Sequence, residues 1–168
     1  MEPPLQRRKS AFISNNHEGI RFKKEEAVYE PRTGVYAVIF HPSLDQVGLI
    51  RTDCGKLFLP GGGIEGQETH EQCLVREARE EMGSAISVGA YIGSAKRYFY
   101  STKEHKDSLS IGHFYICKKG EKMCEPTEED HHYEWVPSED AIGGLFHEHQ
   151  SWAVREAALK KKTLHNKP

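Results

Sequence analysis

Three glutamates stand close together near the middle of the sequence, at Glu77, Glu80 and Glu81. In a helix these spacings bring the carboxylates onto one flank, where each like-charge pair costs roughly 0.2–0.5 kcal/mol. A bound divalent cation would offset this repulsion, because hard ions such as Mg²⁺ take carboxylate ligands. The alternative is a solvated acidic face, which Arg76 and Arg79 would partly neutralise. The glutamates alone leave both interpretations open.

A glycine triplet, Gly61–Gly63, follows Pro60 and comes shortly before the glutamates. Glycine lets a backbone approach a ligand closely, and the exposed peptide groups can contact a metal ion or a phosphate. Most such triplets are ordinary turns, so this one gains weight only from its neighbours. The residues that follow it at fixed spacing are Gly62, Glu68, Arg76, Glu77, Glu80, Glu81 and Gly83.

The stretch from Gly62 to Ser84 reads GGIEGQETHEQCLVREAREEMGS and resembles the Nudix box of the Nudix hydrolases, the MutT-like superfamily. The box has the pattern G-x5-E-x7-R-E-U-x-E-E-x-G-U, in which U is a bulky aliphatic residue. All seven charged and glycine positions match. The two U positions depart, with Ala78 and Ser84. Both are packing positions, so the departures bear on local packing rather than on metal binding.

The resemblance implies a Mg²⁺-dependent pyrophosphohydrolase, with Mn²⁺ as a substitute, that cleaves the diphosphate linkage of a nucleoside diphosphate derivative. Nucleoside triphosphates and dinucleoside polyphosphates are the favoured substrates. The metal-binding positions of the family fall here on Glu77, Glu80, Glu81 and the carbonyl oxygen of Gly62. The alternative is a non-catalytic nucleotide-binding regulatory module with the same fold. Such a relative is expected to have lost a paired glutamate or the arginine, whereas this chain keeps all of them.

Two further catalytic roles follow from the resemblance. The loop glutamate pairs with the arginine in the family, so Glu68 and Arg76 are expected to fix the glycine loop against the helix. A carboxylate outside the box often accepts the proton of the attacking water. The candidates here are Glu128, Glu129 and Asp130, of which we favour Glu129. The alternative is that Glu129 is a solvated loop residue.

Aromatic and basic residues outside the helix are candidate substrate contacts. Tyr98 and Tyr100 lie 14 and 16 residues past Ser84, and a tyrosine near this spacing mildly favours dinucleoside polyphosphate hydrolases within the family. Tyrosine can stack on a base, as can Phe58, and Arg97 can contact phosphates. The alternative is that the segment around Tyr98 is a plain β-strand and that Arg97 is an ordinary surface charge.

A helix must position the glutamates, and its ends are marked in the sequence. Thr69 and Gln72 form a capping box, and Gly83 is a C-terminal stop, so the helix is predicted between 69 and 82. Its core-facing stripe is predicted to consist of Leu74, Val75, Ala78 and Met82.

Strands surround this helix. Apolar and β-branched runs predict them at 34–40, 47–52, 56–59, 85–93, 95–101, 108–117 and 131–136, with the first two paired as a hairpin. A short helix is predicted from 137 and a longer one over about 148–159. This order indicates an α/β (α+β) protein, and the resemblance implies the Nudix fold, an α/β/α sandwich with a mixed β-sheet between helices.

Length and composition limit the number of domains, the cellular location and the kinds of partner. The 168 residues correspond to one domain, predicted over 11–168 after a flexible N-terminal arm at 1–10. A net charge of −2 gives no basic field for nucleic acid. Without a signal segment or an apolar run near the roughly 20 residues of a membrane span, we expect a cytoplasmic protein. Its expected partner is a small-molecule nucleotide, and a homodimer is left open.

The cysteines and histidines of the sequence favour neither disulfide bonds nor a zinc site. None of the four cysteines forms a CxxC pair, so reduced thiols are expected. Histidines come close together at His131–His132 and at His147 and His149, but no cysteine stands at ligand spacing to them. A zinc site is therefore not favoured.

Overall fold

The computed structural model describes residues 10–16, 19–20, 28–101 and 104–166, with backbone alone in the first two ranges. The predicted N-terminal arm therefore lies outside the described residues except for Ser10. The elements are β1 (Ser10–Asn16), β2 (Gly19–Ile20), β3 (Glu30–Ile39), β4 (Gln46–Thr52), β5 (Leu57–Phe58), β6 (Gly61–Gly63), α2 (His70–Met82), β7 (Ser84–Ser101), β8 (Lys106–Lys122), β9 (His131–Pro137), α3 (Ser138–Gly144) and α4 (Glu148–His165). In this part of the chain, no helix is long and apolar enough to cross a membrane.

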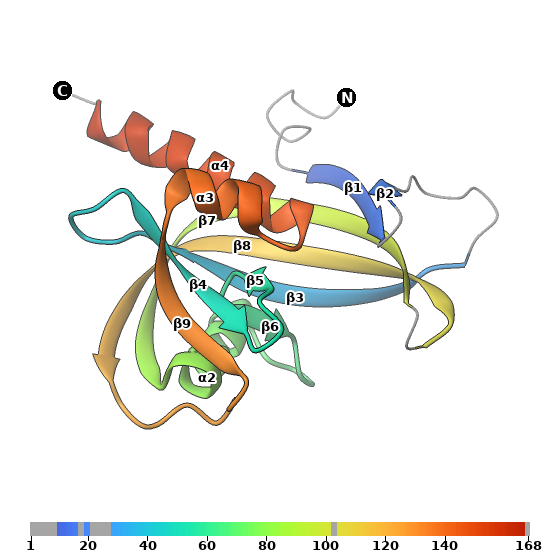
Figure 1. Ribbon diagram of the computed structural model, residues 1–168, viewed down its shortest axis with the longest axis horizontal. Coiled ribbons are helices and arrows are strands. Elements are labelled where there is room, and N and C mark those ends of the chain that lie inside the picture. Colours follow the sequence, from blue (N-terminus) through green and yellow to red (C-terminus); the bar gives the residue numbers. More distant parts are fainter. Residues whose placement is uncertain (1–9, 17–18, 21–27, 102–103, 167–168) are drawn as a thin grey trace.

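The strands form two sheets. The larger has the order β2-β1-β7-β8-β3-β6 and is mixed, because β1 runs parallel to β7 and β3 parallel to β8 while the other pairs are antiparallel. The smaller sheet, β5-β4-β9, is antiparallel. Helices α3 and α4 lie on one side of the strands and α2 on the other (Figure 1). The predicted α/β/α arrangement with a mixed sheet is therefore confirmed.

Strand β3 separates the two halves of the core. Alternate side chains of a strand point to opposite faces. Val35 and Ile39 are buried in the cluster that includes α2, whereas Val38 is buried in the cluster that includes α4. Both faces of β3 are covered, so the strand fixes the two helical layers relative to one another.

The predicted hairpin is wrong beyond its turn. β3 and β4 belong to different sheets and share only the bridge between Phe40 and Val47. β3 is bordered instead by β8 and by β6, the glycine triplet, which sequence reasoning left as a turn. The two strands predicted at 85–93 and 95–101 are one bulged strand, β7. Both differences arise because pairing with distant segments decides these elements.

Helix α2 begins and ends where the sequence predicts. The Thr69 side chain accepts from the Gln72 amide, and the Gln72 side chain accepts from the Thr69 amide, which completes the capping box. Gly83 adopts the left-handed conformation, with φ 64°, at the C-terminal end. These caps satisfy backbone groups that the helix itself leaves free.

The buried face of α2 is turned slightly from the predicted one. Leu74, Ala78 and Met82 are buried as predicted, but Val75 is 45% exposed and the prediction for it is wrong. Cys73 takes its place in the core with no exposed surface. Burial raises the pKa of the Cys73 thiol to about 11, so the thiol is protonated. All four cysteines of the chain are free.

The two departures from the box pattern are accommodated. Ala78 is 1% exposed and packs in the α2 core, so a small residue fills this position. Ser84 is 2% exposed, and its hydroxyl donates to the carbonyl oxygen of Met82 at 3.3 Å. Burying a polar group costs little when it is hydrogen-bonded.

The loop between β8 and β9 is fastened to the end of α2. The amides of Thr127 and Glu128 donate to the carbonyl oxygen of Glu80, at 2.9 and 3.2 Å, and the Cys124 amide donates to that of Gly83 at 3.1 Å. A Cβ at Gly83 would lie 2.0 Å from the Cys124 carbonyl oxygen. Glycine is thus required there by both conformation and space.

Gly83→Ala is expected to lower the free energy of unfolding by about 1–3 kcal/mol, because alanine is strained at positive φ and would displace the loop. The matched control is Gly143→Ala in α3, where an added Cβ meets nothing within 4 Å. That variant should be neutral or more stable by up to about 1 kcal/mol. Urea unfolding measures both, and equal stability of the two variants would contradict this account.

Candidate active site

Arg76 joins the glycine loop to helix α2. Its Nε and Nη2 donate to Oε1 and Oε2 of Glu68 at 2.6 and 3.1 Å, and Nη2 also donates to the carbonyl oxygen of Gly63 at 2.9 Å. This two-point contact holds the pKa of the Glu68 carboxyl below its usual value. The pairing of Glu68 with Arg76 that the resemblance implies is therefore present.

The same guanidinium neutralises part of the glutamate cluster. Nη1 of Arg76 lies 2.9 Å from Oε1 of Glu77 and 3.1 Å from Oε2 of Glu80. Burial raises the pKa of Glu77, and the hydrogen bond and charge of Arg76 oppose that rise. Two of the three glutamates predicted to bind metal are thus held in place by one cation.

Glu81 is the most deeply buried of the three glutamates, with 4% of the residue exposed. Its Oε1 accepts from the Gly61 amide at 2.8 Å. The pKa of Glu81 is raised to about 8, mainly by burial and also by the charges of Glu77, Glu128 and Glu80, while the Gly61 hydrogen bond opposes the rise. A cation close to this carboxylate would favour its charged form.

Gly62 makes room for Glu77. It pairs with Val35 in the contact between β6 and β3. A Cβ at Gly62 would lie 2.3 Å from Oε1 of Glu77. Any larger residue would therefore push this carboxylate away from the loop, which explains why glycine stands at the first position of the box.

Among the loop carboxylates, the structure brings Glu128 toward the box rather than the predicted Glu129. The Glu128 amide is bonded to α2, and the charge of its carboxylate raises the pKa of both Glu77 and Glu81. Glu129 is exposed to solvent. The fastening of the loop to the end of the helix selects which of these neighbouring side chains faces the box.

His131 is a site residue that sequence reasoning missed. It opens β9, and its Nδ1 lies 3.3 Å from Oε2 of Glu81. Nδ1 is buried and has no hydrogen-bond partner among the described residues. Ligand atoms of Glu128, Asp130 and His131 all lie within 4.8 Å of one another. The signal available in the sequence was a histidine directly after an acidic run, which we considered only for zinc.

These side chains fit a divalent cation. The site offers three kinds of donor to a hard or borderline ion. These are carboxylates that are buried or half-buried, a ring nitrogen without a hydrogen-bond partner among the described residues, and the backbone carbonyl groups of the glycine loop. The donors come from α2, the glycine loop, the loop before β9 and the first residue of β9, and they are Glu77, Glu80, Glu81, Gly62, Glu128 and His131.

Tyr98 and Tyr100 are not brought to the box. Tyr98 is only 6% exposed, and Tyr100 lies near the end of β7. Across β8, Tyr98 is in register with Pro31 of β3, whereas Gly62 pairs with Val35. The tyrosine thus stands roughly 13 Å farther along the sheet, at about 3.3 Å per residue. For Tyr98, the interpretation as a strand residue agrees with this placement.

Arg97 and Phe58 gather instead near the start of α4. The Arg97 guanidinium stacks 4.8 Å from the ring centre of Phe99, and burial lowers its pKa while the charge of Glu148 opposes the change. The rings of Phe58 and His147 lie 5.2 Å apart. The predicted candidates therefore share one region, although β7 and β5 belong to different sheets.

Tyr36 connects this region with the box. The pKa of Tyr36 is raised to about 12, mainly by burial and also by the charges of Glu77 and Glu81, while the charge of Arg97 opposes the rise. His149, with 1% exposure, packs against the Tyr36 ring at 6.3 Å. Sequence reasoning missed Tyr36, since only the sheet places it beside the acidic cluster, and it considered His149 only for zinc.

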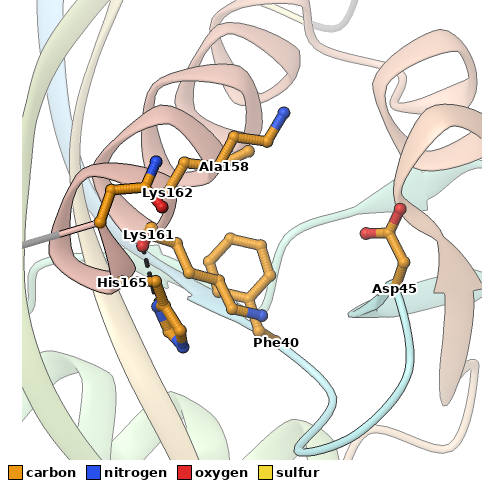
Figure 2. A pocket seen from close by; sticks show the side chains of 7 residues that line it. Phe40, Asp45, Ala158, Lys161, Lys162 and His165 are labelled. Carbon is orange, nitrogen blue, oxygen red and sulfur yellow. Dashed lines mark hydrogen bonds between the residues drawn. The ribbon is translucent and has the colours of Figure 1, made fainter.

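A separate cavity of about 310 Å³ lies at the C-terminal end of α4. Figure 2 shows Lys161 extending beside the Phe40 ring, and its Nζ lies 4.5 Å from the ring centre. Nδ1 of His165 lies 3.0 Å from the Lys161 carbonyl oxygen, and Asp45 stands on the opposite wall. The cavity includes no residue of the box, and its charges are mixed.

Comparisons with known proteins agree with this geometry. The family model of the NUDIX domain matches residues 30–159. The chain is 28% identical over 93 residues to the nucleoside triphosphatase NudI of Escherichia coli O139:H28 (strain E24377A / ETEC), a match that covers 52% of this chain and 66%, just under two thirds, of that protein. The chain is also similar in fold to solved structures.

Two solved structures share the fold. A NUDIX hydrolase from Nitrosomonas europaea has a TM-score of 0.62 at 16% identity, over 79% of this chain and 91% of that one. The MutT protein from Methanosarcina mazei Go1 has a TM-score of 0.58 at 23% identity, over 79% and 97% of the two chains. The family match over most of the sequence, with the box held in this geometry, shows that the chain belongs to the Nudix hydrolase superfamily.

Proposed function

We propose that this protein is a divalent-metal-dependent hydrolase that cleaves a phosphoric anhydride bond of a nucleoside triphosphate. The observation that carries the proposal is the convergence of Glu77 and Glu80 on Arg76, with Glu81 and Glu128 close enough for their charges to interact with this group. A non-catalytic binding module would not need a complete set of repelling carboxylates. Retention of the whole set therefore favours the enzyme.

The residues of the site have separate roles in the proposed reaction. Water forms a bond to one phosphorus while the bridging P–O bond breaks, and the proton of the water passes to a carboxylate. We assign this proton to Glu128, because its carboxylate approaches the box from a separate element. Arg76 and Glu68 hold the glycine loop in position. When bound, Mg²⁺ or Mn²⁺ would compensate the charge that develops on the phosphate oxygens.

Nucleoside triphosphates are favoured over dinucleoside polyphosphates. The relative NudI is named a nucleoside triphosphatase, and the tyrosines that favoured the second class lie away from the box. Phe58 and Arg97 are the proposed substrate contacts. A panel of nucleoside triphosphates, dinucleoside polyphosphates and ADP-ribose, assayed with Mg²⁺, tests this order through kcat/KM. The single domain, the cytoplasmic location, the absence of nucleic-acid partners and the homodimer stay predictions.

Glu80→Gln is expected to lower kcat by roughly 10²–10³-fold, the usual effect of removing one preorganised catalytic group. Its Tm should stay equal or rise, since one repelling charge is lost, and the rise in Tm that Mg²⁺ gives the wild type by binding the folded state should shrink. Glu71→Gln, exposed in the first turn of α2, is the matched control. Equal kcat in the two variants would contradict the role of Glu80, whereas a wild type without turnover on the whole panel would favour the binding module.

Arg76→Ala should lower both activity and stability, because Glu68, Glu77 and Glu80 lose a shared partner and the glycine loop loses its tie to α2. The expected fall in Tm is roughly 3–6 °C. Arg79→Ala, an exposed arginine of the same helix, should change Tm by only about 1–2 °C. Calorimetry compares the two, and the division of roles fails if their Tm values coincide.

Glu128→Gln and Glu129→Gln decide which loop carboxylate accepts the proton. We expect kcat to fall by roughly 10²–10³-fold for Glu128→Gln and to change little for Glu129→Gln, with similar Tm values for both. Steady-state kinetics on the best substrate of the panel measures the difference. The reverse order would restore the role to Glu129.

A further inference from the structure

The His131 ring lies within ion-pair distance of the buried carboxylate of Glu81 but makes no hydrogen bond to it. The Nδ1 atom lies 3.3 Å from Oε2 of a side chain that is 95% buried, since only 5% of it is exposed. Nδ1 has no hydrogen-bond partner in the described part of the chain, and Oε1 of Glu81 is occupied by the Gly61 amide. A buried polar atom left in this state requires an explanation.

The separation of the two atoms is that of neighbours around one metal ion. Oxygen and nitrogen ligands lie roughly 2.0–2.2 Å from Mg²⁺, Mn²⁺ or Zn²⁺. Two such ligands at angles between 90° and 110° are therefore roughly 3.0–3.5 Å apart. The observed 3.3 Å falls within this interval. A shared cation would satisfy both atoms at once.

Two further carboxylates stand near the His131 ring, which places the ring in an acidic environment. The ligand atoms of Glu128, Asp130 and His131 lie within 4.8 Å of one another, and Nε2 of His131 is 4.0 Å from Oδ1 of Asp130. The loop is held to α2 through the Glu128 amide. The donors therefore belong to elements that are already fixed relative to each other.

We propose that His131 is a metal ligand of this protein and that its Nδ1, together with Glu81, completes a mixed nitrogen and oxygen site that binds Mn²⁺ more tightly than Mg²⁺. The proposal rests on the proposed function, because it adds a ligand from β9 to the metal-binding carboxylates. Imidazole is a softer donor than carboxylate, and affinity for mixed donor sets increases along the first transition row, whereas Mg²⁺ keeps mainly oxygen ligands and water.

The test uses Mn²⁺ alone with the full chain and no nucleotide. Pulsed electron paramagnetic resonance should detect a ¹⁴N coupling on Mn²⁺ bound to the wild type. His131→Gln should abolish this coupling and weaken Mn²⁺ binding roughly 10–100-fold, with a smaller change for Mg²⁺ measured by competition. His132→Gln, which removes an exposed neighbour whose Nε2 contacts Asp53, should keep both the coupling and the affinity.

The outcomes separate this inference from the proposed function. Bound Mn²⁺ without a ¹⁴N coupling, or a coupling that persists in His131→Gln, overturns the role of His131. If the wild type still hydrolyses the best nucleotide, the proposed function stands in that case. A wild type that binds no divalent ion overturns both. If His131→Gln fails to fold by circular dichroism, the wild-type spectrum and its retention in His132→Gln decide the matter.

Discussion

The guanidinium of Arg76 is the interaction on which the site depends. Several carboxylates crowd the start, the flank and the end of one short helix, and their mutual repulsion would otherwise favour separating them. One planar cation contacts Glu68, Glu77, Glu80 and a loop carbonyl at the same time. A point charge such as lysine cannot match this set of directions, since only arginine offers donors in a rigid fork. The helix, the glycine loop and the acidic face are thus one unit.

The second fastening is made by the backbone. The carbonyl groups at the end of a helix have no partner within it, and here the loop before β9 supplies amides to two of them. The segment that carries Glu128 and His131 therefore supplies the hydrogen-bond donors that the carbonyl groups at the end of α2 require. These backbone hydrogen bonds bring the loop to the helix. The side chains of the loop therefore lie near Glu81 without a strong attraction between the side chains themselves.

What could be predicted from the sequence was mainly local. The capping box at Thr69 and the glycine stop at Gly83 fixed α2, since each depends on residues within one turn. The predicted hairpin was wrong, and the glycine triplet was not recognised as a strand, because β3 pairs with segments that are distant in the sequence. Within the site, Glu128 and Glu129 are equivalent in sequence, and only the amide bonded to Glu80 distinguishes them. Tyr36 could not be identified because the sheet alone places it between the box and Arg97.

The bonds from Thr127 and Glu128 to the Glu80 carbonyl have a consequence for dynamics. A protected backbone amide exchanges its hydrogen with solvent when its bond opens, and contiguous segments often open as one cooperative unit. The exchange rates of these two loop amides therefore report the fraying of the last turn of α2. Hydrogen exchange of the loop amides thus becomes a measure of the stability of the last turn of α2, which carries the acidic residues.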